Sequence, residues 1–243
     1  MAAFRFVNLL LMIGALAVSA GAAYVFFGDP EGDRIEQKSI AYEKKIDAAK
    51  TRAETKDVNA QYKLAKLYRD GEGRTKNLRL AHNWFKKAAE QGHSGAQYQL
   101  GRLYEKGQGG RQDYHKAAEW YHLAAKLGRS RDAHFALGDL YFHGRGVSQD
   151  PGASIDWYML AAEQGHPMAQ YVMGAMYHDG WGVSKNPIEA YKWFKLASRH
   201  ADRIIAEDPR RDPNRALKKL SLQMSSSQQV AAEKAVKGWK PKP

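Results

Sequence analysis

One segment of this sequence occurs four times, and this repetition constrains the fold more than any other feature. The copies align on Ala60, Ala96, Ala133 and Ala169, which are 36, 37 and 36 residues apart. They read AQYKLAKLYRDGEG, AQYQLGRLYEKGQG, AHFALGDLYFHGRG and AQYVMGAMYHDGWG. Self-similarity at a fixed period of roughly 20–50 residues is typical of solenoids, in which each unit contacts only its neighbours. The sequence therefore predicts a row of like units instead of one central core.

Each copy is predicted to form a helix, a turn and a second helix. In the third copy Ala133, Leu137 and Tyr141 are spaced by four residues, which places them on one helix face. Two glycines follow at shared positions, where a helix can end with a positive φ. The turn then ends in Asn or Asp, residue types that cap the next helix. These capping residues are Asn77, Asp113, Asp150 and Asn186.

The predicted second helix carries a tryptophan and then small residues. The alanine pair Ala88-Ala89 has equivalents in the next two copies, and small side chains let neighbouring helices approach closely. Because the tryptophans recur at one offset, we expect them to fill the core and not to bind a ligand. A glycine ends this helix in three copies, whereas the fourth has Ala201, which predicts that its helix continues towards Arg203. The tryptophans are Trp84, Trp120, Trp157 and Trp193.

This constellation resembles the Sel-1-like repeat family, a relative of the tetratricopeptide repeats. The resemblance lies in A-x-x-x-L-G-x-x-Y-x-x-G-x-G, then Asn or Asp, then W-Y/F-x-x-A-A-x-x-G, and covers Ala60 to about Ala201. It implies an all-α, right-handed solenoid of helix-turn-helix repeats, in an exported bacterial member of the family. One departure is Ala65, which stands where the other copies have glycine. The chain has no cysteine, so it differs from the cysteine-bridged branch of the family.

Segments on both sides of the repeats are predicted to cover the two ends of the solenoid. Arg34 to Glu54 is polar and helix-prone, and Ser225 to Ser227 precede a short amphipathic helix that resembles a terminal cap. Asp208-Pro209 and Asp212-Pro213 indicate a loop before this cap. The predicted organisation is a membrane anchor or signal segment (1–28), a polar helix that caps the N-terminal end (29–59), four repeats (60–204), and a loop with a C-terminal capping helix and basic tail (205–243).

The N-terminal segment Phe6–Phe27 is uncharged and predominantly apolar. Its 22 residues would form a helix of ~33 Å, long enough for a hydrocarbon core of ~30 Å. Arg5 precedes the segment, whereas mainly acidic residues follow it. The positive-inside rule then places the N-terminus in the cytosol and the repeats in the periplasm. We therefore expect a single-pass protein of the bacterial inner membrane.

A cleaved signal peptide is the alternative for the same segment. Val18-Ser19-Ala20 and Ala20-Gly21-Ala22 offer small residues to a signal peptidase. The apolar run continues through Tyr24 to Phe27, past both sites, which favours a retained anchor. Cleavage would release the repeats into the periplasm.

The net charge of +12 suggests acidic partners. From Arg199 to Pro243 there are eleven Lys/Arg against five Asp/Glu, so this tail is a candidate for contact with anionic lipid. Export of the folded part argues against nucleic acid as the partner. Protein partners, membrane or envelope proteins above all, are expected instead.

No motif predicts a catalytic, metal or cofactor site. The four Gly-x-Gly turns have neither a preceding strand nor the Gly-Lys-Ser/Thr of a phosphate-binding loop. Gly92 to Ala96 is close to a G-x-S-x-G nucleophile elbow, but a helix instead of a strand leads into it. His93 and His166 occupy equivalent linker positions, and no histidine spacing brings metal ligands together, so ordinary surface histidines are expected.

The predicted functional surface is the groove lined by the first helix of each pair, which the resemblance places on the concave face. Side chains at offsets 3, 6 and 10 from the aligned alanines point away from the buried stripe, and four of the six in the first two copies are basic. An ordinary solvated face is the other interpretation of this pattern. The predicted groove residues are Lys63, Lys66, Gln99, Arg102, Lys106, Asp139 and His143.

The expected function is that of a non-catalytic scaffold or adaptor that binds other proteins. The alternative is an accessory structural subunit of a membrane complex, in which small residues such as Gly14 and Gly21 let the anchor pack against other helices. An envelope hydrolase is disfavoured, because no nucleophile, base and orienting residue occur together.

Overall fold

The computed structural model describes residues 30–71, 75–128 and 130–242. Within these residues every regular element is a helix. The elements are α2 (Pro30–Glu54), α3 (Val58–Asp70), α4 (Leu78–Glu90), α5 (Ser94–Lys106), α6 (Tyr114–Gly128), α7 (Arg131–His143), α8 (Pro151–Glu163), α9 (Pro167–Asp179), α10 (Pro187–Ser198), α11 (Ala201–Glu207), α12 (Pro213–Ser221) and α13 (Ser226–Gly238).

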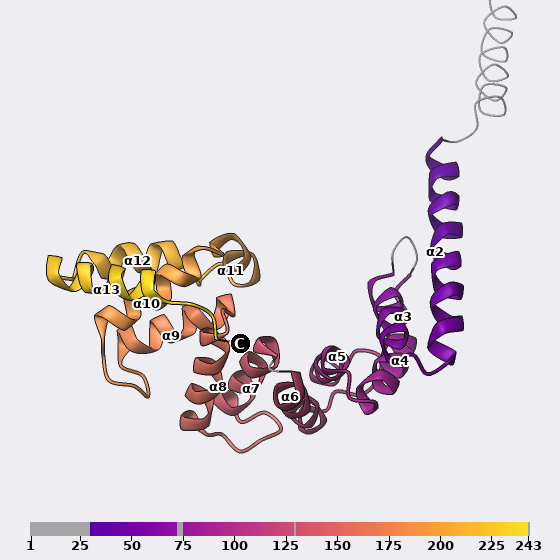
Figure 1. Ribbon diagram of the computed structural model, residues 1–243, viewed down its shortest axis with the longest axis horizontal. Helices are drawn as coiled ribbons and strands as arrows, with labels where there is room; N and C mark the ends of the chain where they lie inside the picture. The colour runs from indigo at the N-terminus through magenta and orange to yellow at the C-terminus, as the bar shows by residue number, and fades with distance from the viewer. Residues whose placement is uncertain (1–29, 72–74, 129, 243) are drawn as a thin grey trace, which may run out of the picture.

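Four helix pairs form the body of the molecule. The pairs are α3 with α4, α5 with α6, α7 with α8 and α9 with α10, and the second helix of each pair packs on the first helix of the next. Stacking the pairs produces an arc, and α11 lies over the inner side of this arc (Figure 1). The predicted all-α repeat architecture is therefore confirmed.

The first helix of each pair has sharply defined ends. It begins after a residue whose side chain accepts a hydrogen bond from the N–H three positions later, and it ends at a glycine with φ between 62° and 74°. Only glycine adopts this left-handed conformation at low cost. The four N-caps are Asp57, His93, Ser130 and His166.

The second glycine of the turn has a different role. Gly109 has a φ of +81°, and a Cβ atom there would lie 2.2 Å from the carbonyl oxygen of Leu78. Gly146 approaches the backbone of Tyr114 in the same way, at 2.3 Å. Leu78 and Tyr114 begin the second helix of the preceding repeat. The turn of one repeat therefore rests directly on the repeat before it, which requires glycine.

The core aromatic of each repeat is the residue after the tryptophan. Tyr121 and Phe85 are fully buried, whereas Trp84, Trp120 and Trp157 are half-buried. The prediction that the tryptophans fill the core is therefore confirmed in full only for Trp193, whereas the other three pack against the core from its edge. The reason is that the following ring faces the partner helix of the same pair, where a glycine makes room for it in the last three repeats.

A buried glutamine joins successive repeats. The side-chain amides of Gln61, Gln97 and Gln170 each donate a hydrogen bond to a carbonyl eight residues earlier, at 3.2 Å. These carbonyls lie at the C-terminal ends of α2, α4 and α8, where backbone oxygens lack partners in the helix. The glutamines therefore stabilise the junctions between repeats.

The N-terminal end of the solenoid is covered by α2. The hydroxyl of Tyr42 donates a hydrogen bond of 2.7 Å to the carbonyl of Leu67 in α3, and Ala53, near the C-terminal end of α2, is buried against Ala60 and Leu64. Ile35 and Ile40, nearer the start of α2, are exposed. The C-terminal half of α2 therefore provides most of the packing.

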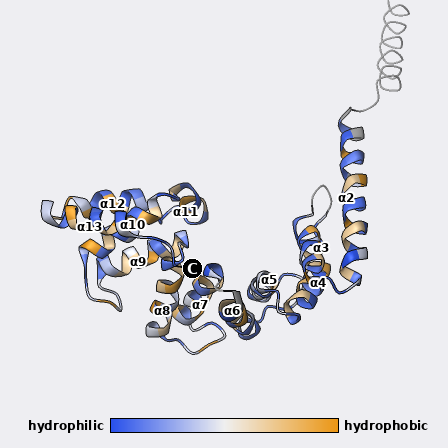
Figure 2. Cartoon of the chain, viewed as in Figure 1, coloured by the Kyte–Doolittle hydropathy of each residue, from blue (hydrophilic) through white to orange (hydrophobic). Residues whose placement is uncertain are grey.

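The C-terminal end is more elaborate than predicted. The second helix of the fourth repeat does not continue to Arg203, because α10 ends at Ser198 and a turn at Arg199 and His200 separates it from α11. A further unpredicted helix, α12, lies in the region expected to be a loop. Its outer residues are hydrophilic (Figure 2).

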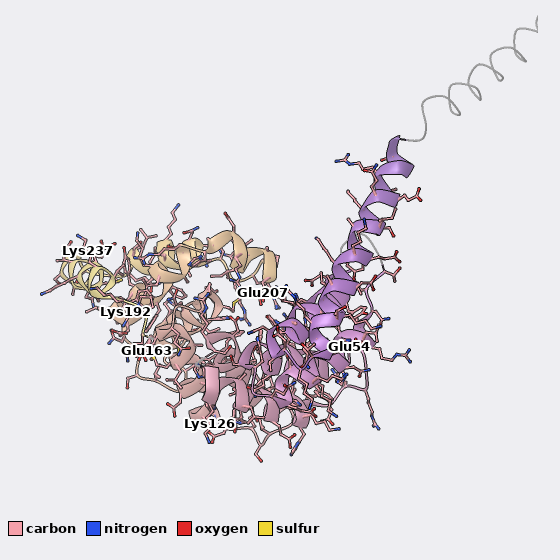
Figure 3. The ribbon with its side chains drawn as sticks, turned by 45° about the vertical axis from the view of Figure 1, so that its right-hand side comes forward. Glu54, Lys126, Glu163, Lys192, Glu207 and Lys237 are labelled. Atoms are coloured by element: carbon pink, nitrogen blue, oxygen red, sulfur yellow. The ribbon has the colours of Figure 1, made fainter. Side chains whose placement is uncertain are left out.

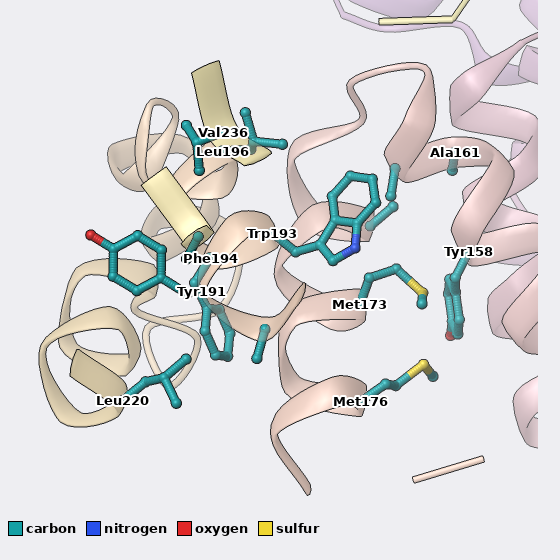
Figure 4. Close-up of a cluster of buried hydrophobic side chains, with 14 of the residues drawn as sticks. Tyr158, Ala161, Met173, Met176, Tyr191, Trp193, Phe194, Leu196, Leu220 and Val236 are labelled. Carbon is teal, nitrogen blue, oxygen red and sulfur yellow. The ribbon is translucent and has the colours of Figure 1, made fainter. Parts of the chain in front are cut away.

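Helices α12 and α13 both pack on α10 and cover the last repeat. Leu220 of α12 and Val236 of α13 join Trp193 and Phe194 in one buried cluster (Figure 4). The predicted helix after Ser225 is present as α13 and starts with a capping box. The chain then returns to α8, where Lys242 contacts Glu163 through both its backbone N–H (2.9 Å) and its ammonium group (2.7 Å).

No helix in the described part of the chain is long and apolar enough to span a bilayer. The predicted anchor, Phe6–Phe27, lies outside the described residues.

Candidate protein-binding groove

A column of aromatic side chains follows the first helices of the four repeats. Each member lies two residues after the aligned alanine and is half-buried. Each also packs on the buried ring of its own repeat, with ring centroids 5.5–5.8 Å apart. The aromatic column consists of Tyr62, Tyr98, Phe135 and Tyr171.

Sequence reasoning missed this column, although the signal was present. The four copies begin AQY, AQY, AHF and AQY, so the third letter is aromatic every time. The tryptophans recur at an equally regular offset and are larger, so the pattern alone favours them over this column. The column matters because half-buried aromatic side chains provide contact area that is already ordered before a partner binds.

Cations lie beside the first two rings of the column. The ammonium of Lys66 is 5.9 Å from the ring centroid of Tyr62, and the guanidinium of Arg102 is 5.9 Å from that of Tyr98. Both cations are one helical turn after their ring. Asp139 and Ala175 occupy the same position in the third and fourth repeats. The groove is therefore basic at one end only.

Two adjoining hollows open on the inner side of the arc. The larger has a volume of about 370 Å³, and Arg203 and Glu207 of α11 form one of its walls. The smaller, of about 230 Å³, includes Asp208 and Arg211. Figure 3 shows Glu207 at the end of α11 that faces the opening of the arc.

Five of the predicted groove residues line these hollows. Gln99, Arg102 and Lys106 line the larger hollow, His143 lines the smaller one, and Asp139 contributes to both. Lys63 and Lys66 are exposed on α3 and lie outside both hollows. The structure therefore brings the residues of the second and third repeats together, and it adds α11, which sequence reasoning did not place here.

Two carboxylates of the groove are held by core tyrosines. The Tyr121 hydroxyl donates to Glu105 and the Tyr158 hydroxyl donates to Asp139, each at 2.6 Å. Burial raises the pKa of Asp139, while the Tyr158 hydroxyl and the nearby Arg211 oppose this shift. Burial, together with the neighbouring carboxylates, raises the pKa of both tyrosines, so they act as donors at neutral pH. These carboxylates are fixed parts of the surface.

The cations of the basic end are available to a ligand. Arg69 is engaged, since it pairs with Asp70 (2.7 Å) and donates to Gln99 (2.8 Å). By contrast, four cations make no ion pair with any residue in the described ranges. They are Lys63, Lys66, Arg102 and Lys106.

The expectation that His166 and His93 are ordinary surface histidines is wrong, because both are helix caps. Nδ1 of each accepts a hydrogen bond of 3.1 Å from the backbone N–H three residues later. Each imidazole also stacks on the aromatic column, on Phe135 at 4.4 Å and on Tyr62 at 4.3 Å. Burial lowers the pKa of His166 to about 3, and it lowers that of His93 as well. His166 is therefore neutral at pH 7.

Antiparallel helix pairs in tandem, with repeated aromatic and charged positions along the inner face, define an α-solenoid of the tetratricopeptide-like class. The Sel1 repeat profile matches residues 58–93, 94–128, 131–166 and 167–202, more than half of the chain. The chain therefore belongs to the Sel1 repeat family. Proteins of this family generally mediate protein–protein interaction and are generally non-enzymatic.

Solved structures of Sel1 repeat proteins are similar to this chain. A protective antigen present in uropathogenic Escherichia coli strains, which displays an SLR fold, shares 39% sequence identity with a TM-score of 0.60. The match covers 64% of this chain and 33% of the antigen, so this chain corresponds to about a third of that protein. A Sel1 repeat protein from Oxalobacter formigenes shares 31% identity with a TM-score of 0.58, over 69% of this chain and 70% of that one. Comparison with curated proteins gives no match.

Proposed function

We propose that this protein is a non-catalytic scaffold that binds a partner protein in the groove formed by α3, α5 and α7. The supporting observation is the basic end of the groove, where Lys66 and Arg102 lie beside half-buried rings and make no ion pair with described residues. Charged side chains that are already positioned favour fast and selective association with a partner of opposite charge. The family's general role in protein–protein interaction agrees with this surface.

The site of action in this proposal is the bacterial periplasm, where the N-terminal anchor holds the repeats close to the membrane. Its support is the sequence of Phe6–Phe27, an uncharged segment long enough to span the bilayer. The partner would accordingly be a membrane or envelope protein. The basic residues of the C-terminal tail would face anionic lipid or an acidic protein surface.

Photo-crosslinking in intact cells tests the proposal. A photoreactive residue in place of Gln99, which lines the larger hollow, should capture a specific protein that mass spectrometry identifies. The same residue in place of Lys86, exposed on α4, is the matched control and should not capture it. Capture only from positions within 6–27 would instead favour the accessory subunit of a membrane complex.

A further inference from the structure

We propose that the surface formed by Tyr62, Lys66, Gly95, Tyr98 and Arg102 is the docking site for a short acidic helix of the partner, which inserts one bulky aliphatic side chain between the two rings. This inference rests on the proposed function and specifies the chemistry of the segment that binds. We call this surface the open aromatic site.

The chain itself provides an example of such an occupant. Helix α11 has seven residues and inserts one of them, Ile204, into the inner face of the third and fourth repeats. Ile204 is 1% exposed and packs with Met168, Ala197 and the rings of Phe135 and Tyr171. A single aliphatic side chain therefore anchors a short helix between two neighbouring members of the aromatic column.

The open aromatic site lies on the first and second repeats and has the same arrangement of residues as the covered site on the third and fourth repeats. Tyr62, His93, Gly95 and Tyr98 have the offsets of Phe135, His166, Met168 and Tyr171. In both places a histidine caps the first helix of the second repeat. The stacking geometry also agrees, at 4.3 Å and 21° for His93 on Tyr62 and at 4.4 Å and 14° for His166 on Phe135. An apolar anchor can therefore dock in the same way.

One difference sets the size of the anchor. Met168 supports Ile204 in the covered site, whereas the open aromatic site has Gly95 at this position. The missing side chain leaves Gly95 half-exposed, while Met168 is 3% exposed. We therefore expect an anchor of about the size of isoleucine beside the rings of His93 and Tyr62, which lie 3.1 Å and 3.4 Å from the Cβ position of Gly95.

A second difference sets the charge of the partner. In the covered site, Arg203 and Glu207 of α11 both line the hollow that contains Asp139, and Arg211, just after α11, lines the smaller hollow with Asp139. The segment that covers this site therefore brings a cation to an acidic groove residue. Lys66 stands at the offset of Asp139 in the open aromatic site, and Arg102 follows in the next repeat. The sign is reversed, so the complementary helix carries acidic residues around its anchor.

A labelled peptide with the sequence of residues 200–208, but with Glu in place of Arg203, tests the inference. Its binding to the full-length protein in detergent is measured by fluorescence anisotropy. We expect saturable binding that Arg102→Glu weakens at least tenfold at low salt and that Gly95→Met, which fills the site, weakens at least fivefold. Lys86→Glu on α4 should leave the affinity unchanged. A second peptide with Ser in place of Ile204 should not bind.

Two results would overturn the inference: no saturable binding of the acidic peptide, or binding that neither Arg102→Glu nor Gly95→Met reduces. Circular dichroism and melting of each variant show whether it is folded. Arg102→Glu changes a charge one helical turn after Tyr98 and leaves Gly95 in place, so it provides a test independent of packing at Gly95. If position 99 captures a cellular partner while the peptide fails to bind, the scaffold function stands and this assignment of its partner is wrong.

Discussion

The ring of Tyr158 packs directly against the backbone of Gly138, so closely that a Cβ atom on Gly138 would lie 2.5 Å from Cδ1 of the ring. Gly101 with Tyr121 and Gly174 with Phe194 repeat the relationship, each at 2.7 Å. The glycine between the two helices of a repeat is therefore required for contact with the core ring. The first repeat has Ala65 instead, and there the ring is that of Phe85.

Gly138→Ala should destabilise the protein, because the Tyr158 ring has to move away from the new methyl group. Overpacking of this kind typically costs about 1–3 kcal/mol, which exceeds the gain in helix propensity of about 1 kcal/mol. The free energy of unfolding is measured by urea denaturation. Gly152→Ala in α8 is the control, since its nearest neighbour would be Asp150 Oδ1 at 3.4 Å, and it should be neutral or slightly stabilising.

The two adjacent aromatic residues of α6 should differ in their importance for stability. Tyr121 is fully buried and Trp120 only half-buried, so Tyr121→Ala should cost about 3–5 kcal/mol and Trp120→Ala clearly less. Tyr121→Phe removes only the hydrogen bond to Glu105 and should cost about 1–2 kcal/mol. Equal or reversed costs in urea denaturation of the two alanine variants would show that the tryptophans form the core after all.

The repeats were predictable because their features are local and recur. Glycine at a helix end, Asn or Asp before the next helix and a spacing of four residues each have one structural meaning, and four copies reinforced it. Which of two neighbouring aromatic residues enters the core was not predictable in the same way, since Trp120 and Tyr121 lie on adjacent helix positions. Only the location of the partner helix, with Gly101 opposite Tyr121, decides between them.

The groove was partly predictable for the same reason. Offsets from the aligned alanines located Gln99, Arg102 and Asp139 on one face. The segment after the last repeat has no second copy with which to compare it, and α11 has only seven residues. The position of α11 over the groove depends on the packing of Ile204 between the rings of Phe135 and Tyr171. These rings are distant from Ile204 in the sequence, so no local pattern predicts the contact.

The free energy of unfolding should decrease as the pH is lowered, because of the buried cap His166. Its pKa is about 3 in the folded protein and about 6.5 in the unfolded chain, so below pH 6.5 the unfolded chain binds a proton that the folded protein does not. This contribution to stability is fully present above about pH 6.5 and decreases progressively as pH falls towards 3. His166→Asn keeps a capping acceptor but does not titrate, so melting temperatures from pH 7.5 to 5 should depend less on pH in this variant.

The N-terminal segment should be retained in the mature protein. Because the apolar run continues through Phe27, past the small residues at positions 18–22, we expect the intact N-terminus in the membrane fraction and resistance to alkaline extraction. Mass spectrometry of the purified protein reads the N-terminus directly. A mature chain that lacks about the first 20 residues and is released by alkali would establish signal cleavage instead.

Charge reversal in the groove should slow association with the partner without unfolding the protein. Lys66→Glu combined with Arg102→Glu changes two cations that make no ion pair among the described residues, so the free energy of unfolding should change by less than about 1 kcal/mol. Exposed charges act mainly by steering, so the loss should appear in the association rate and diminish at high salt. Surface plasmon resonance with the crosslinked partner measures both. Unchanged association at low salt would place the binding surface elsewhere, and the basic residues from Arg199 onward would be the next to reverse.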